Sequence, residues 1–116
     1  MQITVKGRHL PVTEELRECV DRRFEKVSKQ VSDLAVLEVE LCVERNPANP
    51  DNQVAEATLY LKGITLRAKD SSRDMKNAIN LIADEMAVQV KRHRDKRRAR
   101  REARTVTVQA EVPPLP

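Results

Sequence analysis

The sequence predicts an α+β fold in which a four-stranded sheet carries two helices on one face. Apolar residues alternate with polar ones along four short segments, which is the period of a strand with one buried face. Along two longer segments apolar residues recur every three or four positions, which is the period of an amphipathic helix. These segments follow one another in the order β-α-β-β-β-α.

The N-terminal part of the chain predicts a strand followed by a helix. Residues 2–8 alternate between apolar and polar side chains, and Gly7 allows the chain to turn out of the strand. Thr13 is a favourable N-cap, and the two Glu residues after it favour a helix N-terminus electrostatically. We expect one helix over residues 14–30. Its predicted buried stripe consists of Leu16, Val20, Phe24, Val27 and Val31.

The middle of the chain predicts three consecutive strands. Residues 35–45 and 53–62 alternate cleanly, and the segment 46–52 between them is rich in Pro, Asn and Asp, as loops are. Gly63 marks a tight turn before a fourth strand over residues 64–69. Because a helix joins the first strand to the second, we expect that pair to be parallel. The later pairs are hairpins and should be antiparallel.

The last predicted helix, over residues 73–104, has two halves of different composition. We expect residues 70–72 to supply its N-terminal caps. Residues 91–104 hold nine Lys or Arg against two acidic residues, a net charge of +7, whereas the other 102 residues sum to −3. At ~1.5 Å per residue this helix would be ~48 Å long, so its charged end must project beyond the sheet. The apolar stripe of its first half is Met75, Ile79, Ile82, Met86 and Val90.

The domain organisation follows from the same composition shifts. We expect one folded domain over residues 1–98, a basic helix extension to about residue 104, and a flexible tail or linker start over residues 105–116. No apolar run approaches the ~18 residues that a membrane span needs, and the N-terminus lacks the apolar block of a signal peptide. We therefore expect a cytoplasmic protein. Cys19 and Cys42 make neither a disulfide framework nor a metal site.

The basic run predicts a polyanionic partner, RNA in particular. Each Lys or Arg that neutralises a phosphate releases a counterion, and duplex RNA is read mostly by shape and backbone. Arg outnumbers Lys seven to two in residues 91–104, which favours forked phosphate contacts. Scarce aromatic residues argue against a base-stacking platform. The outward-facing acidic residues of the strands (Glu38, Glu40, Glu44 and Glu56) would repel RNA, so we expect them to be turned away from phosphate.

Other functions are less compatible with the sequence. Neither of its two glycines falls in a phosphate-loop pattern, no nucleophile–base pairing stands out, and no enzyme activity is expected. His9 and His93 have no ligand-spaced partner, so we expect no metal site. One alternative is a generic double-stranded-RNA or DNA binder, which would bind any naked duplex. A protein-interaction module whose basic helix meets an acidic partner would be insensitive to RNase.

Short motifs spread over residues 1–98 point to a known family. They are MQI at 1–3, GR at 7–8, VTEELRE at 12–18, ATL at 57–59 with Gly63, LRA at 66–68, DM at 74–75 and AIN at 78–80. Together they resemble the ribosome hibernation promoting factors, a family also called protein Y.

The resemblance implies a fold akin to double-stranded-RNA-binding domains. It also implies binding to 16S-type rRNA in the decoding region of the small ribosomal subunit, where messenger RNA and transfer RNA would sit. The expected effect is inhibition of translation under stress or in stationary phase, without catalysis, cofactor, small-molecule substrate or membrane. Long members of the family add a C-terminal domain that pairs ribosomes, so pairing is expected only if the native protein has such a domain.

The resemblance also implies particular basic positions. Arg23 and Lys26 on the first helix match basic positions of the family, as do Lys91 or Arg92, and Lys96, at the end of the last helix.

The last helix also departs from the family pattern. Lys76 stands where the family usually has an aromatic residue, and Glu85 and Val88 stand where it usually has basic residues. All candidate RNA-binding residues are basic and lie on the two predicted helices. They are Arg23, Lys26, Lys29, Lys76, Lys91, Arg92, Arg94, Lys96, Arg97, Arg98, Arg100, Arg101 and Arg104.

Overall fold

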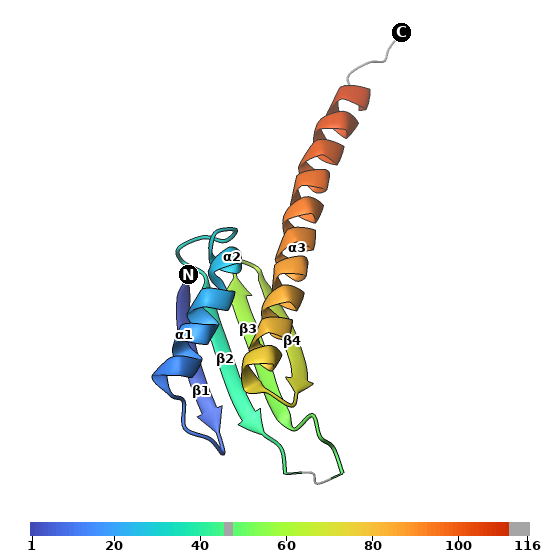
Figure 1. The fold of residues 1–116 in the computed structure, drawn as a ribbon. Coiled ribbons are helices and arrows are strands. Elements are labelled where there is room, and N and C mark those ends of the chain that lie inside the picture. The colour runs from blue at the N-terminus through green and yellow to red at the C-terminus, as the bar shows by residue number, and fades with distance from the viewer. Residues whose placement is uncertain (46–47, 112–116) are drawn as a thin grey trace.

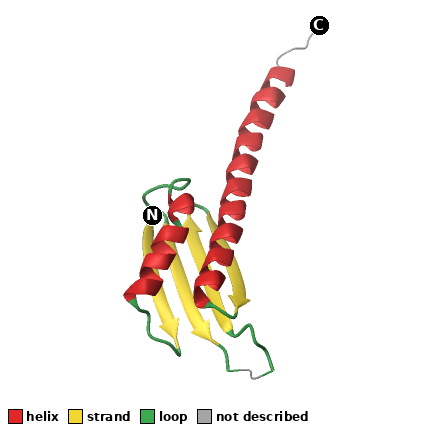
Figure 2. Cartoon of the chain, viewed as in Figure 1, coloured by secondary structure: helices red, strands yellow, loops and turns green. Residues whose placement is uncertain are grey.

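The structure is a computed structural model that describes residues 1–45 and 48–111, with side chains up to Arg101. Two helical segments and one long helix lie on one face of a four-stranded sheet, and the other face is open (Figures 1 and 2). The elements are β1 (Gln2–Arg8), α1 (Glu14–Arg23), α2 (Glu25–Ser28), β2 (Val36–Val43), β3 (Gln53–Leu61), β4 (Ile64–Ser72) and α3 (Met75–Glu111).

The sheet has the predicted topology. Its strand order is β1-β2-β3-β4, with β1 parallel to β2 and the other two pairs antiparallel. The register aligns Val5, Val39, Ala57 and Ala68 in one row across the four strands. Val39, Ala57 and Ala68 are buried beneath the helices. The predicted α+β class, strand directions and helix placement are therefore confirmed.

The buried face of the sheet and the helices enclose one mainly aliphatic core. Phe24 is completely buried, whereas Tyr60, the other aromatic residue of the sequence, is 41% exposed. The Tyr60 hydroxyl lies 3.3 Å from Glu38 Oε2, to which it donates. The predicted stripe of α3 is buried along its whole length. The buried residues of α3 are Met75, Ala78, Ile79, Ile82, Ala83, Met86 and Val90.

The first helix differs from its prediction because the chain turns at Phe24. Thr13 caps α1 as predicted, and its Oγ1 accepts from the Leu16 N–H at 3.2 Å. Phe24 then leaves helical geometry, with φ −89° and ψ 3°, and separates α1 from α2. The Phe24 carbonyl accepts from the N–H groups of both Val27 and Ser28. Phe24 and Val27 are both completely buried, so the turn places both side chains in the core.

The start of α3 also differs from its prediction. Residues 70–72 do not occupy the cap position, because they extend β4 and pair with residues 53–55 of β3. Ser72 still contacts the helix start, because its Oγ accepts from the Asp74 N–H at 3.4 Å and from Asn77 Nδ2 at 2.9 Å. Asp74 takes the capping position instead, and its Oδ1 accepts from the Lys76 N–H at 3.4 Å. Periodicity missed this extension because polar residues at a strand end resemble a helix cap.

The far end of α3 continues past the expected boundary. The helix runs to Glu111, so residues 105–111 are helical rather than the tail expected there, and residues 112–116 lie outside the described part. The projecting helix gives the chain a radius of gyration of 19.1 Å, against ~13 Å for a compact domain of this length. Among the described residues, no helix combines the length and apolar character needed to cross a membrane.

Two glycines have different structural roles. Gly63 has φ +82° and forms the β3–β4 turn, as predicted. Gly7 does not end β1, which continues to Arg8. Instead, a Cβ at Gly7 would lie 2.3 Å from the Leu10 carbonyl oxygen, so only glycine fits there. His9, with φ +64°, provides the turn after the strand.

Replacing Ile82 by Ala should lower the free energy of unfolding by about 2–5 kcal/mol, because Ile82 is completely buried and the change leaves a cavity. Urea denaturation followed by circular dichroism measures this. The matched control is Val88→Ala, on the same helix but 48% exposed, which should change stability by less than about 0.5 kcal/mol. Equal losses for the two variants would contradict the assigned burial of α3.

Candidate nucleic-acid interface

The exposed half of α3 carries most of the candidate residues. Val90 is 2% exposed, and no later side chain in the described part of the chain is buried. Helix positions three, four and seven apart share a face, so most of the described cations beyond Val90 fall into two rows. Lys91, which follows Val90 directly, is exposed and is counted in neither row. We call Arg94, Arg97, Arg98 and Arg101 the first row. We call Arg92, Lys96 and Arg100 the second row.

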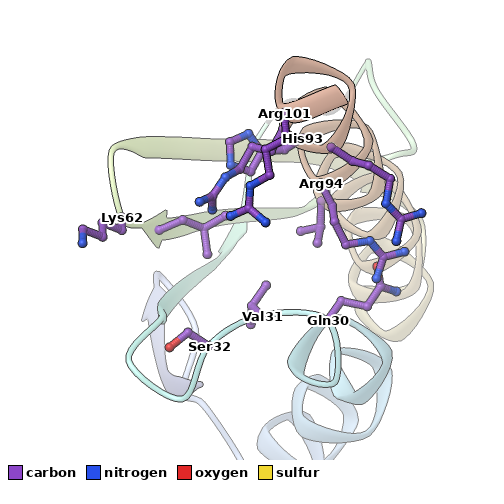
Figure 3. Close-up of a pocket in the computed structure, with 11 residues that line it drawn as sticks. Gln30, Val31, Ser32, Lys62, His93, Arg94 and Arg101 are labelled. Atoms are coloured by element: carbon purple, nitrogen blue, oxygen red, sulfur yellow. The ribbon is translucent and has the colours of Figure 1, made fainter. Parts of the chain in front are cut away.

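The first row forms one wall of a cleft of about 370 Å³, which we call the cationic cleft (Figure 3). The opposite wall is the segment that follows α2, and the turn between β3 and β4 closes one side. No acidic residue lines it among the described residues. Its lining residues are Gln30, Val31, Ser32, Leu61, Lys62, Val90, His93, Arg94, Arg97, Arg98 and Arg101.

The cationic cleft contains residues that sequence reasoning missed. Gln30, Lys62 and His93 were not among the RNA-binding candidates, yet all three line it. They come from three parts of the chain that are distant in sequence, and the packing of α3 against α2, β3 and β4 brings them together. The sequence did contain one indication for Lys62. This residue directly precedes the turn glycine, so it must lie at the end of the hairpin.

The second row begins over β4. Arg92 lines a separate hollow of about 380 Å³ together with Arg67 and Lys69, two exposed residues of that strand. The Gln89 Nε2 group donates to the Arg67 carbonyl at 2.5 Å and ties α3 to the strand there. Glu85 lines the same hollow, so the surface between the second row and β4 carries both basic and acidic groups. Arg67 and Lys69 were not among the RNA-binding residues predicted from the sequence.

Two of the three candidate cations on or just after α1 and α2 have protein partners. Arg23, Lys26 and Lys29 line a shallow hollow. Lys26 forms an ion pair with Asp84 of α3, and Lys29 pairs with Glu25 at 3.6 Å. Within the described part of the chain, Arg23 forms no ion pair. Of these three candidates, Arg23 therefore has the charge most available to a ligand.

Lys76 is set apart from the other candidates on α3. It lies in the first turn of the helix, ~30 Å from the first row at ~1.5 Å per residue. It forms an ion pair with Glu15 of α1. The Lys76 hydrogen bond and charge lower the pKa of Glu15, and the Glu15 hydrogen bond and charge raise the pKa of Lys76. This pair joins the two helices at their N-terminal ends. The Arg104 side chain lies outside the described residues.

The open face of the sheet carries both signs of charge. Glu40 and Glu56 lie in one row between Lys6 of β1 and Lys69 of β4. Arg8 pairs with Glu40 at 3.7 Å. The Glu side chains of β2 and β3 lie on the face of the sheet away from the helices. The basic residues of the flanking strands β1 and β4 largely balance their negative charge. The sequence pattern located the Glu residues and did not reveal this balance.

A pair of carboxyl groups lies where α3 crosses β4. Partial burial raises the pKa of Glu85 to about 7, and a hydrogen bond with Asp70 adds to the rise. The same hydrogen bond, together with the Ser71 N–H, lowers the pKa of Asp70. Below neutral pH the carboxyl group of Glu85 is therefore protonated, and it donates a hydrogen bond to the ionised carboxylate of Asp70. Among the described residues, no group of three or more His, Cys, Asp or Glu is placed to hold a metal ion.

Fold and charge together define a small α/β protein that holds a cationic helix clear of its sheet. The chain belongs to the family described as Sigma 54 modulation protein / S30EA ribosomal protein, which matches residues 3–98. This membership confirms the resemblance found in the sequence motifs. The family comprises ribosome-associated factors and not enzymes.

Individual relatives agree with this membership. The chain is 34% identical over 99 residues to the Ribosome hibernation promoting factor of Acinetobacter guillouiae, covering 81% of this chain and 88% of that protein. It is 30% identical over 97 residues to the Ribosome hibernation promotion factor of Picosynechococcus sp., covering 83% of this chain and 50% of that protein. The solved Thermus thermophilus Protein Y N-terminal domain has the same fold, with a TM-score of 0.69, 24% identity, and coverage of 80% of this chain and 99% of that domain.

Replacing Glu85 by Gln should change how stability depends on pH. In the folded state the pKa of Glu85 is about 7, above its ordinary value of 4.5. The folded state therefore binds this proton more tightly than the unfolded state does. As a result, the free energy of unfolding falls as the pH rises from about 4.5 to 7. Gln stays neutral and still donates to Asp70. We expect the variant to lose that slope and to be about 1 kcal/mol more stable at pH 8, after allowance for partial solvent exposure.

Urea denaturation between pH 4 and pH 8 measures this effect. Glu38→Gln, on the open face of the sheet, is the matched control and should keep the slope of the parent protein. An unchanged slope in Glu85→Gln would show that this carboxyl does not contribute.

Proposed function

We propose that this protein is a ribosome hibernation factor of the cytoplasm. In this proposal it binds 16S-type rRNA in the decoding region of the small ribosomal subunit, occupies the sites of messenger RNA and transfer RNA, and inhibits translation under stress or in stationary phase. Residues 1–98 are the ribosome-binding domain, and the basic extension of α3 to about residue 104 adds to it. The names of its relatives, which are ribosome hibernation factors, support this proposal.

The observation that carries the proposal is the concentration of cations on one half of one helix. The first half of α3 is seated in the core, so the two rows beyond Val90 are held in a fixed orientation. Arg dominates both rows, and its planar fork suits two-point contacts with phosphate oxygens. A rigid cationic rod of this kind fits the crowded phosphate backbone of folded RNA, which proteins read mainly by shape.

The inhibitory step follows from steric exclusion rather than chemistry. A protein seated where messenger RNA and transfer RNA bind blocks both by occupying their volume. Its affinity must then come mostly from phosphate contacts, so it should fall steeply with salt. The balanced charge of the open sheet face would leave that face without strong attraction to RNA. Pairing of ribosomes would require a C-terminal domain beyond the residues described here.

Replacing Arg97, Arg98, Arg100 and Arg101 together by Ala should weaken binding to small subunits and flatten its salt dependence. Each lost phosphate contact should reduce the slope of log K against log salt by about one. The fold should persist, because these side chains are exposed. Binding measured by filtration at several salt concentrations gives the slope.

The matched control removes four exposed positive charges that line neither the cationic cleft nor the hollow beside Arg92: Lys6, Arg8, Arg17 and Arg45 to Ala. It should retain most of the affinity and most of the slope. If both quadruple variants lose affinity equally, net charge alone governs binding, and the assignment to α3 is wrong.

Sedimentation with purified small subunits tests the proposed location. We expect salt-sensitive binding that excess messenger RNA and transfer RNA displace, because they would occupy the same sites. Binding that resists both competitors would place the protein elsewhere on the subunit. Absence of co-sedimentation, with strong binding to free duplex RNA, would instead identify a generic RNA-binding module.

A further inference from the structure

We propose that the cationic cleft is a pocket for one unpaired nucleotide of RNA. The first row of α3 would hold its phosphate, and Gln30 Oε1 would accept a hydrogen bond from its base. This inference rests on the proposed function, since it assumes an RNA partner. It adds a base-contacting site to a surface otherwise suited only to phosphate.

The first argument is an unused acceptor. Gln30 Oε1 is buried and has no hydrogen-bond partner among the described residues. Burying a carbonyl oxygen without a donor is unfavourable, and such atoms are few in folded proteins. Gln30 follows α2 and lines the cleft opposite Arg94 (Figure 3). The oxygen itself has almost no exposed surface, so rotation of the Gln30 side chain toward the cleft would bring it to an N–H donor of a ligand.

The second argument is the mixed character of the lining. Val31, Leu61 and Val90 give the cleft an apolar part, and the first row of α3 gives it a positive part. Small-molecule sites combine apolar lining with a few polar groups in this way and occupy ~300–1,000 Å³. The cleft, at about 370 Å³, falls at the small end of that range. A flat base against the aliphatic residues and a phosphate against the guanidinium groups would use both parts.

The third argument concerns which donors are available. Every RNA base carries an N–H group on its Watson–Crick edge, but pairing occupies that edge in a duplex. An unpaired nucleotide keeps every N–H of this edge free for Gln30. Proteins that recognise RNA bases generally do so on unpaired nucleotides for this reason.

The fourth argument distinguishes an RNA chain from a free nucleotide. Cations continue beyond the cleft along the second row, including Lys96 and Arg100, which do not line it. Neighbouring phosphates of a chain could reach those side chains, whereas a free mononucleotide could not. The arrangement therefore favours a nucleotide that remains within its chain.

Two RNAs of equal charge test the pocket. One is an adenine pentanucleotide, and the other is an abasic pentanucleotide with the same phosphates. Fluorescence anisotropy with the full chain at one salt concentration should give about five-fold tighter binding of the adenine oligomer, the gain typical of a hydrogen bond. Gln30→Leu should reduce this ratio to near one. Gln2→Leu, the same change on the open face of the sheet, should preserve it.

A second readout does not depend on any variant. In nuclear magnetic resonance spectra of the unmodified protein, the side-chain amide signal of Gln30 should shift with the adenine oligomer and stay unchanged with the abasic one. Equal affinity for both oligomers, with no shift of this signal, would overturn the nucleotide pocket while leaving phosphate binding intact. Failure to bind either oligomer or small subunits would overturn the proposed function as well. Competition by adenosine monophosphate at the same concentration as the oligomer would overturn the assignment to RNA in favour of a free nucleotide.

Discussion

Burial of the apolar stripe of α3 against β3 and β4 is the constraint on which the rest of the structure depends. The stripe contributes seven residues to the buried core cluster, from Met75 to Val90. Because the same helix then continues without a break, packing in the body determines the direction of the charged half. An isolated, exposed Arg-rich segment would not keep one fixed conformation, because its cations repel one another. Here the buried half provides that order.

Charge is divided between the two parts of the molecule in a consistent way. In the body, ion pairs such as Lys26–Asp84 and Lys76–Glu15 join α1 and α2 to α3. Both pairs are exposed, so their contribution to stability is small, and their effect is mainly to balance charge locally. Beyond Val90 the acidic partners are few. RNA would therefore meet a body of nearly balanced charge and a helix with a strong positive field.

Periodicity was sufficient to predict the elements, because alternation and the 3.6-residue repeat report directly which side of each element is buried. It could not predict the turn at Phe24, because both halves of that helix keep the same apolar spacing. The extension of β4 to Ser72 was missed because its hydrogen bonds lie with β3 and leave no mark in local sequence. The basic residues of α3 were evident from composition. The proximity of Gln30 and Lys62 to those basic residues was not evident, because it arises from tertiary packing alone.

The projection of α3 has a mechanical consequence. The segment from Val90 to Arg101 acts as a lever arm of ~16 Å whose fulcrum is the last buried turn. A tilt of ~5° at that fulcrum would displace Arg101 by ~1.5 Å, which is enough to break a hydrogen bond with phosphate. In the proposed interface, a buried residue such as Met86 beneath the fulcrum would thus alter the alignment of the arginines that contact RNA. A substitution in the core of this protein can therefore change the position of the exposed arginines at the far end of α3.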